Sequence, residues 1–445
     1  MSFKGIIKKI VPSSFLYLYH YFLARLSSFV YGNPSSKMVI FGVTGTGGKS
    51  TVTYLSGKIF ELCSQKVGWT STISFKIGEQ EIPNSLKMTM PGRFFLNRVL
   101  RKMLRFGSRY VFIETTSQGI EQARHKGINY DVALLTNLSP EHIESHGSFE
   151  NYKREKGKLF AEISKNSHKI IDGKKIPKVI VVNLDDKEAS YFLNFSADKY
   201  YGYTLGKIKV SNDLLRLKKV KIIQAYDIDC GPDYLKFKIF GKQIYSKLLG
   251  EFNVYNILAC FCLADIAGID FSAFKKALAK IHFIPGRLEE VISSPFSVFV
   301  DYAHTPHELE KVYQALEKRG GELICVLGSA GGGRDKWKRP ELGRIAGNYC
   351  QKIILTNEDP YDENPLAIIN EIEKGVIPAI SGTSKLCFKI LDRKEAIKKA
   401  MSLAGKDSQI IITGKGSELC ICGPHGKKIP WNDKQVCREL IKGFM

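Results

Sequence analysis

Short apolar runs that end in polar residues recur along the first part of the chain and predict buried strands. Four of them lie at residues 37–41, 109–114, 130–137 and 178–183. Segments of helical periodicity separate these runs, and such alternation is typical of an α/β domain with a mostly parallel sheet. Residues 198–247 alternate more like short antiparallel strands, which we interpret as an insertion, and residues 252–267 have the pattern of a helix.

The pattern continues after Pro285 and Gly286, which mark a predicted domain boundary. Further apolar runs, with helical segments between them, lie at residues 298–301, 323–328, 352–356 and 409–413. They predict a second, Rossmann-like α/β domain. The expected organisation is a helical segment at 1–37, a central domain at 38–283 and a C-terminal domain at 284–445.

The stretch at residues 42–51 joins the first strand to a helix through a glycine-rich turn that ends in Gly-Lys-Ser-Thr. Such a turn lets backbone N–H groups converge on an anion, and the helix N-terminus adds the positive end of its dipole. An ordinary glycine-rich turn is the competing interpretation, but this motif directly after a strand favours a phosphate-binding loop (P-loop) in the central domain. The predicted nucleotide contacts are Gly45, Thr46, Gly47, Gly48, Lys49, Ser50 and Thr51.

Polar residues at the ends of the neighbouring strands are candidates for a metal site. Glu114 ends one strand, where its carboxylate is well placed to bind Mg²⁺. His142 follows the next strand in a polar cluster and is a candidate metal ligand, although on its own it is more typical of a loop histidine. The charged helix at residues 150–160 has by itself the pattern of a solvated surface.

These motifs occur in the order seen in the Mur ligase family, and they are most similar to its MurE type. The nine matching stretches are the phosphate loop and residues 114–119, 136–142, 152–156, 250–256, 285–289, 301–306, 331–340 and 414–418. The resemblance implies ATP-dependent formation of an amide bond. A carboxylate of a UDP-N-acetylmuramyl-dipeptide-like acceptor becomes an acyl phosphate, which the amine of a free amino acid then attacks.

The resemblance also implies roles for individual residues. Lys49, Glu114, His142 and Lys156 are the implied catalytic group, with Lys156 carbamylated. Two Mg²⁺ ions are implied, one held by Ser50 or Thr51 with Glu114, the other with help from His142 and Lys156. Nucleotide contacts are implied for Asn256, Arg287, Asp301 and His304, and substrate contacts for Thr89, Ser117, Arg124, Arg334, Lys336, Asp359, Gly414 and Glu418.

The chain departs from the MurE pattern in three places. The 37 residues before the first strand are too few for the N-terminal domain that binds the uridine nucleotide, so we expect that domain to be lacking. Tyr361 stands where diaminopimelate-adding enzymes have an arginine, and Ser417 and Gly47 replace a histidine and an asparagine. The alternatives are therefore a lipid-linked or folate-like acceptor, a different amine such as lysine, or a nucleotide-binding scaffold without catalysis.

Charge and composition narrow the class of partner. The net charge of +22 is spread along the chain without a long basic block, which favours phosphate-rich small substrates over nucleic acid. Ten cysteines form no metal-binding spacing and are expected to be reduced thiols in a cytoplasmic monomer. Residues 3–31 predict a basic, aromatic-rich helix, either packed on the nucleotide domain or lying on a membrane surface.

Overall fold

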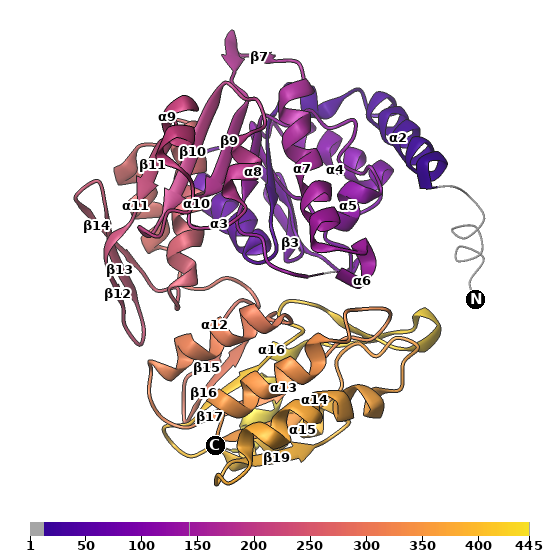
Figure 1. Cartoon of the computed structure of the whole chain (residues 1–445), viewed down its shortest axis with the longest axis vertical. Helices are drawn as coiled ribbons and strands as arrows, with labels where there is room; N and C mark the ends of the chain where they lie inside the picture. Colours follow the sequence, from indigo (N-terminus) through magenta and orange to yellow (C-terminus); the bar gives the residue numbers. More distant parts are fainter. Residues whose placement is uncertain (1–12, 142, 445) are drawn as a thin grey trace. The chain divides into compact units, whose positions relative to one another are not determined.

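The computed structural model describes residues 13–141 and 143–444, which form two compact units (Figure 1). Among the described residues, the first unit contains 13–139, 150–225 and 255–277. The remaining residues, 140–141, 143–149, 226–254 and 278–444, form the second unit.

The first unit is built on one large sheet. Its strands are β1 (Val39–Thr44), β2 (Val67–Thr70), β3 (Ser74–Ile77), β4 (Gln80–Pro83), β5 (Tyr110–Glu114), β6 (Val132–Leu135), β9 (Val179–Asn183), β10 (Lys199–Thr204) and β11 (Lys221–Gln224). They lie in the order β11-β10-β9-β6-β1-β5-β2-β3-β4. All pairs from β11 to β2 are parallel, whereas β3 and β4 add an antiparallel edge. The predicted mostly parallel central sheet is thereby confirmed.

Strand β1 is buried along its whole length. The helices of this unit lie around the sheet (Figure 1). They are α2 (Ser13–Val30), α3 (Lys49–Leu62), α4 (Arg93–Arg105), α5 (Ser117–Glu121), α7 (Phe149–Lys165), α8 (Ala189–Leu193), α9 (Asn212–Leu217), α10 (Phe252–Ile266) and α11 (Phe271–Ala279), with a 3-10 turn at Pro34–Lys37. None of the described helices is long and apolar enough to cross a membrane.

The expected insertion over residues 198–247 is wrong in its first half. Strands β10 and β11 continue the parallel sheet, and only β12 (Tyr226–Cys230), β13 (Leu235–Ile239) and β14 (Lys242–Ser246) form a separate antiparallel sheet. The misleading signal comes from the tyrosines of β10. Tyr203 donates to the carbonyl oxygen of Leu135 at 2.9 Å and Tyr201 donates to Asp265 at 2.8 Å, so both rings are buried with their hydroxyls satisfied.

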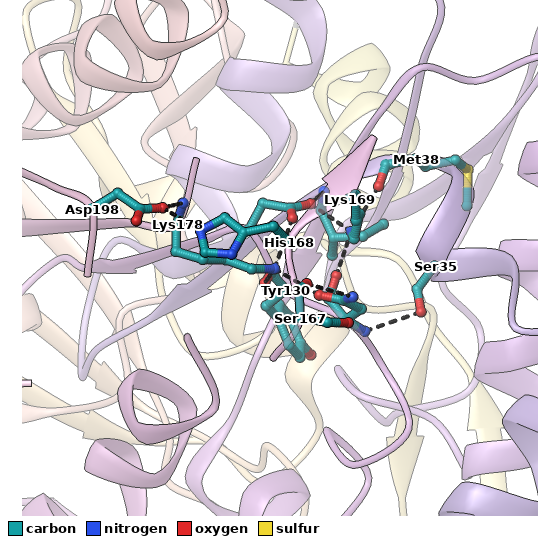
Figure 2. Close-up of polar contacts among 11 residues, drawn as sticks. Ser35, Met38, Tyr130, Ser167, His168, Lys169, Lys178 and Asp198 are labelled. Carbon is teal, nitrogen blue, oxygen red and sulfur yellow. Dashed lines mark hydrogen bonds and ion pairs between the residues drawn. The ribbon is translucent and has the colours of Figure 1, made fainter. Parts of the chain in front are cut away.

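A buried ionic network lies where β6 and β9 begin. The Asp131 carboxylate lies 2.5 Å from Lys169 Nζ and 3.0 Å from Lys178 Nζ. Lys169 also donates to the carbonyl oxygen of Met38 at 2.8 Å (Figure 2). The network thus ties the hairpin of β7 (Lys169–Ile171) and β8 (Lys174–Ile176) to the start of the sheet, at the end opposite the phosphate loop.

The second unit contains a six-stranded sheet in the order β15-β16-β20-β17-β18-β19. These strands are β15 (Glu289–Ile292), β16 (Ser297–Val300), β17 (Leu323–Leu327), β18 (Lys352–Leu355), β19 (Leu386–Lys389) and β20 (Gln409–Ile412). Only β15 is antiparallel, and two apolar clusters fill the two faces, which confirms the predicted α/β architecture. The other elements are α6 (Ile143–His146), α12 (Pro306–Glu317), α13 (Lys338–Tyr349), α14 (Pro365–Ile380), α15 (Arg393–Leu403), α16 (Asp433–Leu440), β21 (Cys420–Cys422), β22 (Lys428–Pro430) and short 3-10 turns at Pro424–Gly426 and Ile441–Gly443.

Candidate active site

The predicted phosphate loop connects β1 to α3 in the first unit. Gly45 has a φ of 146°, and a Cβ atom there would lie 1.9 Å from Oγ1 of Thr136. Gly48 precedes α3 with a φ of 79°, and a Cβ atom there would lie 2.7 Å from Oδ1 of Asn256. Both positions therefore require glycine, because a side chain would be strained and would also collide with a neighbour. Asn256, a predicted nucleotide contact, lies against this loop.

Asn137 holds the loop in shape. Its Oδ1 accepts a hydrogen bond from the Gly47 amide at 2.9 Å, and its Nδ2 donates to the Gly47 carbonyl oxygen at 3.1 Å. Its own carbonyl oxygen accepts from the Thr46 amide at 2.9 Å. Sequence reasoning placed Asn137 in a polar cluster but missed this role. The signal was its position directly after β6, since β6 is the neighbour of β1.

Lys49 begins α3 beside the loop. Its Nζ atom donates to the carbonyl oxygen of Thr46 at 2.6 Å, which holds the side chain back over the loop. The first turn of α3 contains no acidic residue. The helix dipole and the Lys49 ammonium group therefore both favour an anion at this point, as the sequence predicted for nucleotide phosphates.

Ser50 and Glu114, two of the predicted Mg²⁺ ligands, lie together. The Ser50 hydroxyl donates to Oε1 of Glu114 at 2.8 Å, and the Thr72 amide donates to Oε2 at 2.8 Å. The Thr72 hydroxyl also lies 2.7 Å from the hydroxyl of Thr89, a predicted substrate contact. Thr51, the next residue of α3, is buried.

The oxygens of Ser50 and Glu114 fit a hard divalent cation, because Mg²⁺ prefers oxygen ligands and keeps several waters. Within the described part of the chain, no group of three or more His, Cys, Asp or Glu residues could hold a metal ion. Hydroxyl groups, water and phosphate oxygens would have to complete the coordination. His142, the predicted ligand of a second ion, lies outside the described residues.

Lys156 is the one lysine of its stretch of α7 that points at the loop. Its side chain is 1% exposed, and its Nζ atom donates to the carbonyl oxygen of Gly45 at 2.6 Å. The Nζ atom also lies 4.6 Å from the ring centre of Tyr152, whose hydroxyl is 3.2 Å from Oγ1 of Thr46. Its neighbours Lys153 and Lys158 pair with glutamates instead.

Two predicted substrate contacts, Ser117 and Arg124, lie in or just after α5. The Arg124 guanidinium donates to the Met90 carbonyl oxygen and, at 2.6 Å, to Oε1 of Gln122, while burial lowers its pKa. Ser117 is buried at the start of α5. The Arg124 guanidinium is therefore held at the backbone of Met90, in the segment before α4.

In the second unit, Asp301 follows β16 and is enclosed by backbone. Its carboxylate accepts hydrogen bonds from the amides of Leu288 and Ala303, each at 2.5 Å. Burial raises the pKa of Asp301 to about 6, although the charge of Arg287 opposes this shift. The Arg287 guanidinium lies 4.4 Å from the ring centre of Tyr302. Arg287 and Asp301, both predicted nucleotide contacts, are thus close together.

His304 follows in the same loop. Its Nδ1 lies 3.0 Å from the Tyr302 carbonyl oxygen, and its Nε2 lies 3.2 Å from Oε1 of Glu141. Burial lowers the pKa of His304, but the hydrogen bond to Glu141 and the nearby charge of Glu308 outweigh it, so the pKa is raised. The positive form of His304 is therefore favoured.

The predicted substrate residues Asp359 and Glu418 meet on a buried cation, Lys415. The Lys415 Nζ atom lies 2.7 Å from Asp359 and 2.9 Å from Glu418. A Cβ atom at Gly414 would lie 2.7 Å from Oε2 of Glu358, so the adjacent backbone packs tightly against that carboxyl group. Lys415 was missed as a site residue, although it lies in the matched stretch at 414–418.

Arg334 and Lys336 differ in their surroundings. Burial lowers the pKa of Arg334, but the nearby hydroxyl groups of Tyr302 and Tyr361 outweigh this effect, so the pKa is raised. The Lys336 ammonium group is exposed and lies 3.6 Å from Glu363. Arg334 is therefore half-buried, whereas Lys336 lies at the surface.

Arg393, which the sequence did not single out, positions the loops that carry these residues. It forms a bidentate ion pair with buried Asp433, in which two guanidinium nitrogens donate to the two carboxylate oxygens at 2.9 and 2.8 Å. It also donates to the carbonyl oxygens of Asn357 and Thr413, which follow β18 and β20. No local motif reveals such a residue, because its partners are distant in the sequence.

Comparisons with known proteins give the family of the chain. Models of two domain families match, the Mur ligase middle domain over residues 43–264 and the Mur ligase glutamate ligase domain over residues 286–416. A UDP-N-acetylmuramoyl-L-alanyl-D-glutamate–2,6-diaminopimelate ligase of Caldanaerobacter subterraneus subsp. tengcongensis is 36% identical over 426 residues, covering 94% of this chain and 81% of the relative. A UDP-N-acetylmuramyl-tripeptide synthetase of Treponema denticola is 33% identical over 437 residues, with 95% and 79% covered.

A solved structure of a UDP-N-acetylmuramoyl-L-alanyl-D-glutamate–2,6-diaminopimelate ligase is similar in fold. It is 28% identical with a TM-score of 0.59, and the match covers 92% of this chain and 79% of that one.

Proposed function

The chain belongs to the Mur ligase family, and from this we propose that it joins an amino acid to a UDP-N-acetylmuramyl-dipeptide acceptor at the expense of ATP, in peptidoglycan precursor synthesis. The observation that carries the proposal is the phosphate loop with Lys49 at its end and the Ser50–Glu114 pair beside it. These residues would bind a nucleoside triphosphate together with its metal ion.

The proposed reaction proceeds in two steps. A carboxylate oxygen of the acceptor forms a bond to the γ-phosphorus of ATP while the bond between that phosphorus and the β–γ bridging oxygen breaks, releasing ADP. The amine nitrogen of the amino acid then attacks the acyl carbon. The bond from that carbon to the phosphorylated oxygen breaks, inorganic phosphate leaves and the nitrogen loses a proton. Phosphorylation is needed because a free carboxylate is a poor electrophile.

Residues of the first unit supply charge and orientation for the first step. Backbone amides of the loop and the start of α3 bind phosphate oxygens, and Lys49 exchanges its bond to Thr46 for one to the phosphates. Ser50 and Glu114 would hold the metal ion. When bound, Mg²⁺ supplies positive charge that offsets the charge on the transferring phosphoryl group.

We further propose that Lys156 acts as a carbamate, formed when its neutral amine adds to carbon dioxide and releases a proton. Its near-complete burial and its contact with Gly45 support this role. The modification would turn a hydrogen-bond donor into an oxygen ligand for a cation. The unmodified ammonium group instead stabilises the loop through the Gly45 carbonyl oxygen.

Residues of the second unit would select the amine substrate. Tyr361 carries no charge that could pair with a distal carboxylate, so lysine or ornithine competes with diaminopimelate as the substrate. A lipid-linked or folate-like acceptor is the second candidate for the other substrate, and a nucleotide-binding scaffold is the third reading of the chain.

A substrate panel tests the proposal. Purified protein would be incubated with ATP, Mg²⁺ and either a UDP-muramyl-dipeptide, a lipid-linked muramyl peptide or a folate, each crossed with lysine, ornithine, diaminopimelate and glutamate. We expect an amide product with the UDP-muramyl-dipeptide and one of the first three amines, and slower product formation with Glu114→Gln. Turnover only with another acceptor, or ATP binding without any turnover, would contradict the proposal.

A further inference from the structure

Helix α2 has the reverse of the usual amphipathic pattern. Toward the rest of the first unit it presents small and polar residues, among them Ala24, Ser27 and Ser28, which are buried. Its solvent-facing side carries the large apolar residues Phe15, Leu18, Tyr19, Phe22, Leu26, Phe29 and Val30. A helix that covers a core normally buries such residues. Here Phe22 is 62% exposed and Phe29 is 75% exposed.

Specific polar contacts fix the helix in this orientation. The Asn97 amide donates to Oγ of Ser27 at 2.7 Å, and the Ser28 hydroxyl donates to the Gly127 carbonyl oxygen at 2.7 Å. A guanidinium nitrogen of Arg93 lies 3.0 Å from Nδ1 of His20. The apolar side is therefore held outward by hydrogen bonds on the opposite side of the helix.

Helix α4 lies beside α2 and adds positive charge (Figure 1). Arg93 and Asn97 face α2, and the residues that directly follow them, Phe94 and Arg98, are exposed, as is Lys102 one turn later. Helix α4 contains five basic residues and no acidic one, and α2 contains no acidic residue either. The apolar side of α2 is thus next to a helix, α4, with exposed basic residues. Neither helix contains an acidic residue that would neutralise their charge.

We propose that α2 and the exposed side of α4, together called the α2–α4 surface, bind an anionic lipid bilayer. The aromatic and aliphatic side chains of α2 would enter the headgroup boundary, where phenylalanine and tyrosine are favourable. Arg98, Lys102 and Arg105 would contact lipid phosphates, since basic residues next to an amphipathic helix attract anionic leaflets. A lipid surface fits better than a second copy, because two copies would bring like charges of α4 together. The inference does not depend on the proposed ligase activity.

Vesicle flotation of the full chain tests the binding. Vesicles of phosphatidylcholine alone would be compared with vesicles that also contain phosphatidylglycerol, at low and high salt. We expect binding to the anionic vesicles that is stronger by about tenfold or more than to neutral ones and that weakens at high salt, because screening acts on the α4 contacts. Absence of binding to anionic vesicles would overturn the inference.

Two variants separate the apolar and charged contributions. Phe22→Ser with Phe29→Ser should reduce binding at both salt concentrations, whereas Arg98→Glu with Lys102→Glu should abolish the preference for anionic lipid. The matched control is Leu217→Ser with Lys374→Glu, two exposed positions on α9 and α14, and it should bind like the parent. Circular dichroism would verify folding of each variant.

Two results would contradict the inference. The first is equal vesicle binding by the parent and both α2–α4 variants. The second is a dimer that Phe22→Ser with Phe29→Ser disrupts, seen by analytical ultracentrifugation together with no vesicle binding, because a second copy would then cover the surface.

Discussion

The Lys156 Nζ atom donates a hydrogen bond of 2.6 Å to the carbonyl oxygen of Gly45, across 111 positions of sequence. Gly45 is one of two residues of the phosphate loop that tolerate no side chain, so this bond reaches the loop at a tightly constrained point. Helix α7 is thereby coupled to the nucleotide site. Lys156 can influence the reaction as an ammonium group that shapes the loop or as a carbamate that binds a cation.

Replacing Lys156 distinguishes these roles. Lys156→Ala should lower kcat by a factor of roughly 10² or more, the scale seen when a preorganised electrostatic contact is removed. If the carbamate acts, acetate or another short carboxylate should restore part of the activity. Lys158→Ala on the same helix is the control and should retain parental kcat, since Lys158 pairs with Glu155. Full activity of Lys156→Ala would refute both roles.

The Ser50–Glu114 pair should matter for phosphoryl transfer more than for nucleotide binding. Glu114→Gln keeps the size of the side chain but removes its charge, so the Mg²⁺ concentration for half-maximal activity should rise and kcat should fall, whereas Kd for ATP measured without Mg²⁺ should change little. Glu121→Gln, at an exposed position of α5, is the matched control. An unchanged Mg²⁺ dependence in Glu114→Gln would remove Glu114 from the metal site.

Gly45→Ala tests the steric requirement of the loop. The added methyl group would overlap Oγ1 of Thr136, and the positive φ would add strain, so we expect a loss of roughly 1–3 kcal/mol in the free energy of unfolding and weak ATP binding. Gly92→Ala is the control, because its Cβ atom would meet nothing within 4 Å. Urea unfolding and calorimetric titration with ATP provide the measurements, and parental values for Gly45→Ala would show that the loop relaxes freely.

Asp301 should make stability depend on pH in a defined direction. Its pKa is raised by burial to about 6, so between about pH 4 and pH 6 the folded state holds a proton that the unfolded state has lost. Its contribution to the free energy of unfolding is then present below pH 4 and lost as pH rises to 6, by about 3 kcal/mol at 1.36 kcal/mol per pKa unit.

Asp301→Asn should remove this slope. Unfolding free energies of the parent and the variant would be measured in urea from pH 4 to pH 7. The difference between the two proteins should change across that range by the stated amount. Parallel curves would mean that the Asp301 carboxyl group titrates normally in the folded protein.

Breaking the buried Arg393–Asp433 pair should be costly. Arg393→Met leaves the Asp433 carboxylate buried without its partner, and such losses are typically about 3–5 kcal/mol. Arg393→Met with Asp433→Leu should recover much of that stability, and Lys394→Met, at the exposed next residue, should cost little. If the single and double variants are equally unstable, the pair is not the source of the effect.

Local sequence was sufficient wherever a motif and its strand are contiguous. The strand ending at Thr44, the glycine-rich loop and Lys49 form such a unit, and so does the strand that ends at Glu114. Contacts that depend on the order of the strands in the sheet could not be predicted from local sequence. Asn137 can bind the loop because β6 is the neighbour of β1 in the sheet. The sequence pattern of a single strand does not specify its neighbours.

Two other results show further limits. Lys156 could be chosen over Lys153 and Lys158 only through the family resemblance, because three lysines on one helix differ in burial and not in local pattern. The tyrosines of β10 gave a false signal of an antiparallel insertion, since their hydroxyls are satisfied by distant partners inside the fold. In α2 the apolar pattern predicted a helix correctly but could not reveal that its apolar side faces solvent.

The central claim is that the reaction passes through an acyl phosphate. The most direct test follows the oxygen atoms of the acceptor carboxylate into the released phosphate. The acceptor carboxylate would be labelled with ¹⁸O, and the phosphate released during amide formation would be analysed by mass spectrometry. An acyl phosphate predicts that each phosphate carries one ¹⁸O atom from the acceptor and that ADP is the nucleotide product. Unlabelled phosphate, or label recovered in AMP, would contradict the account.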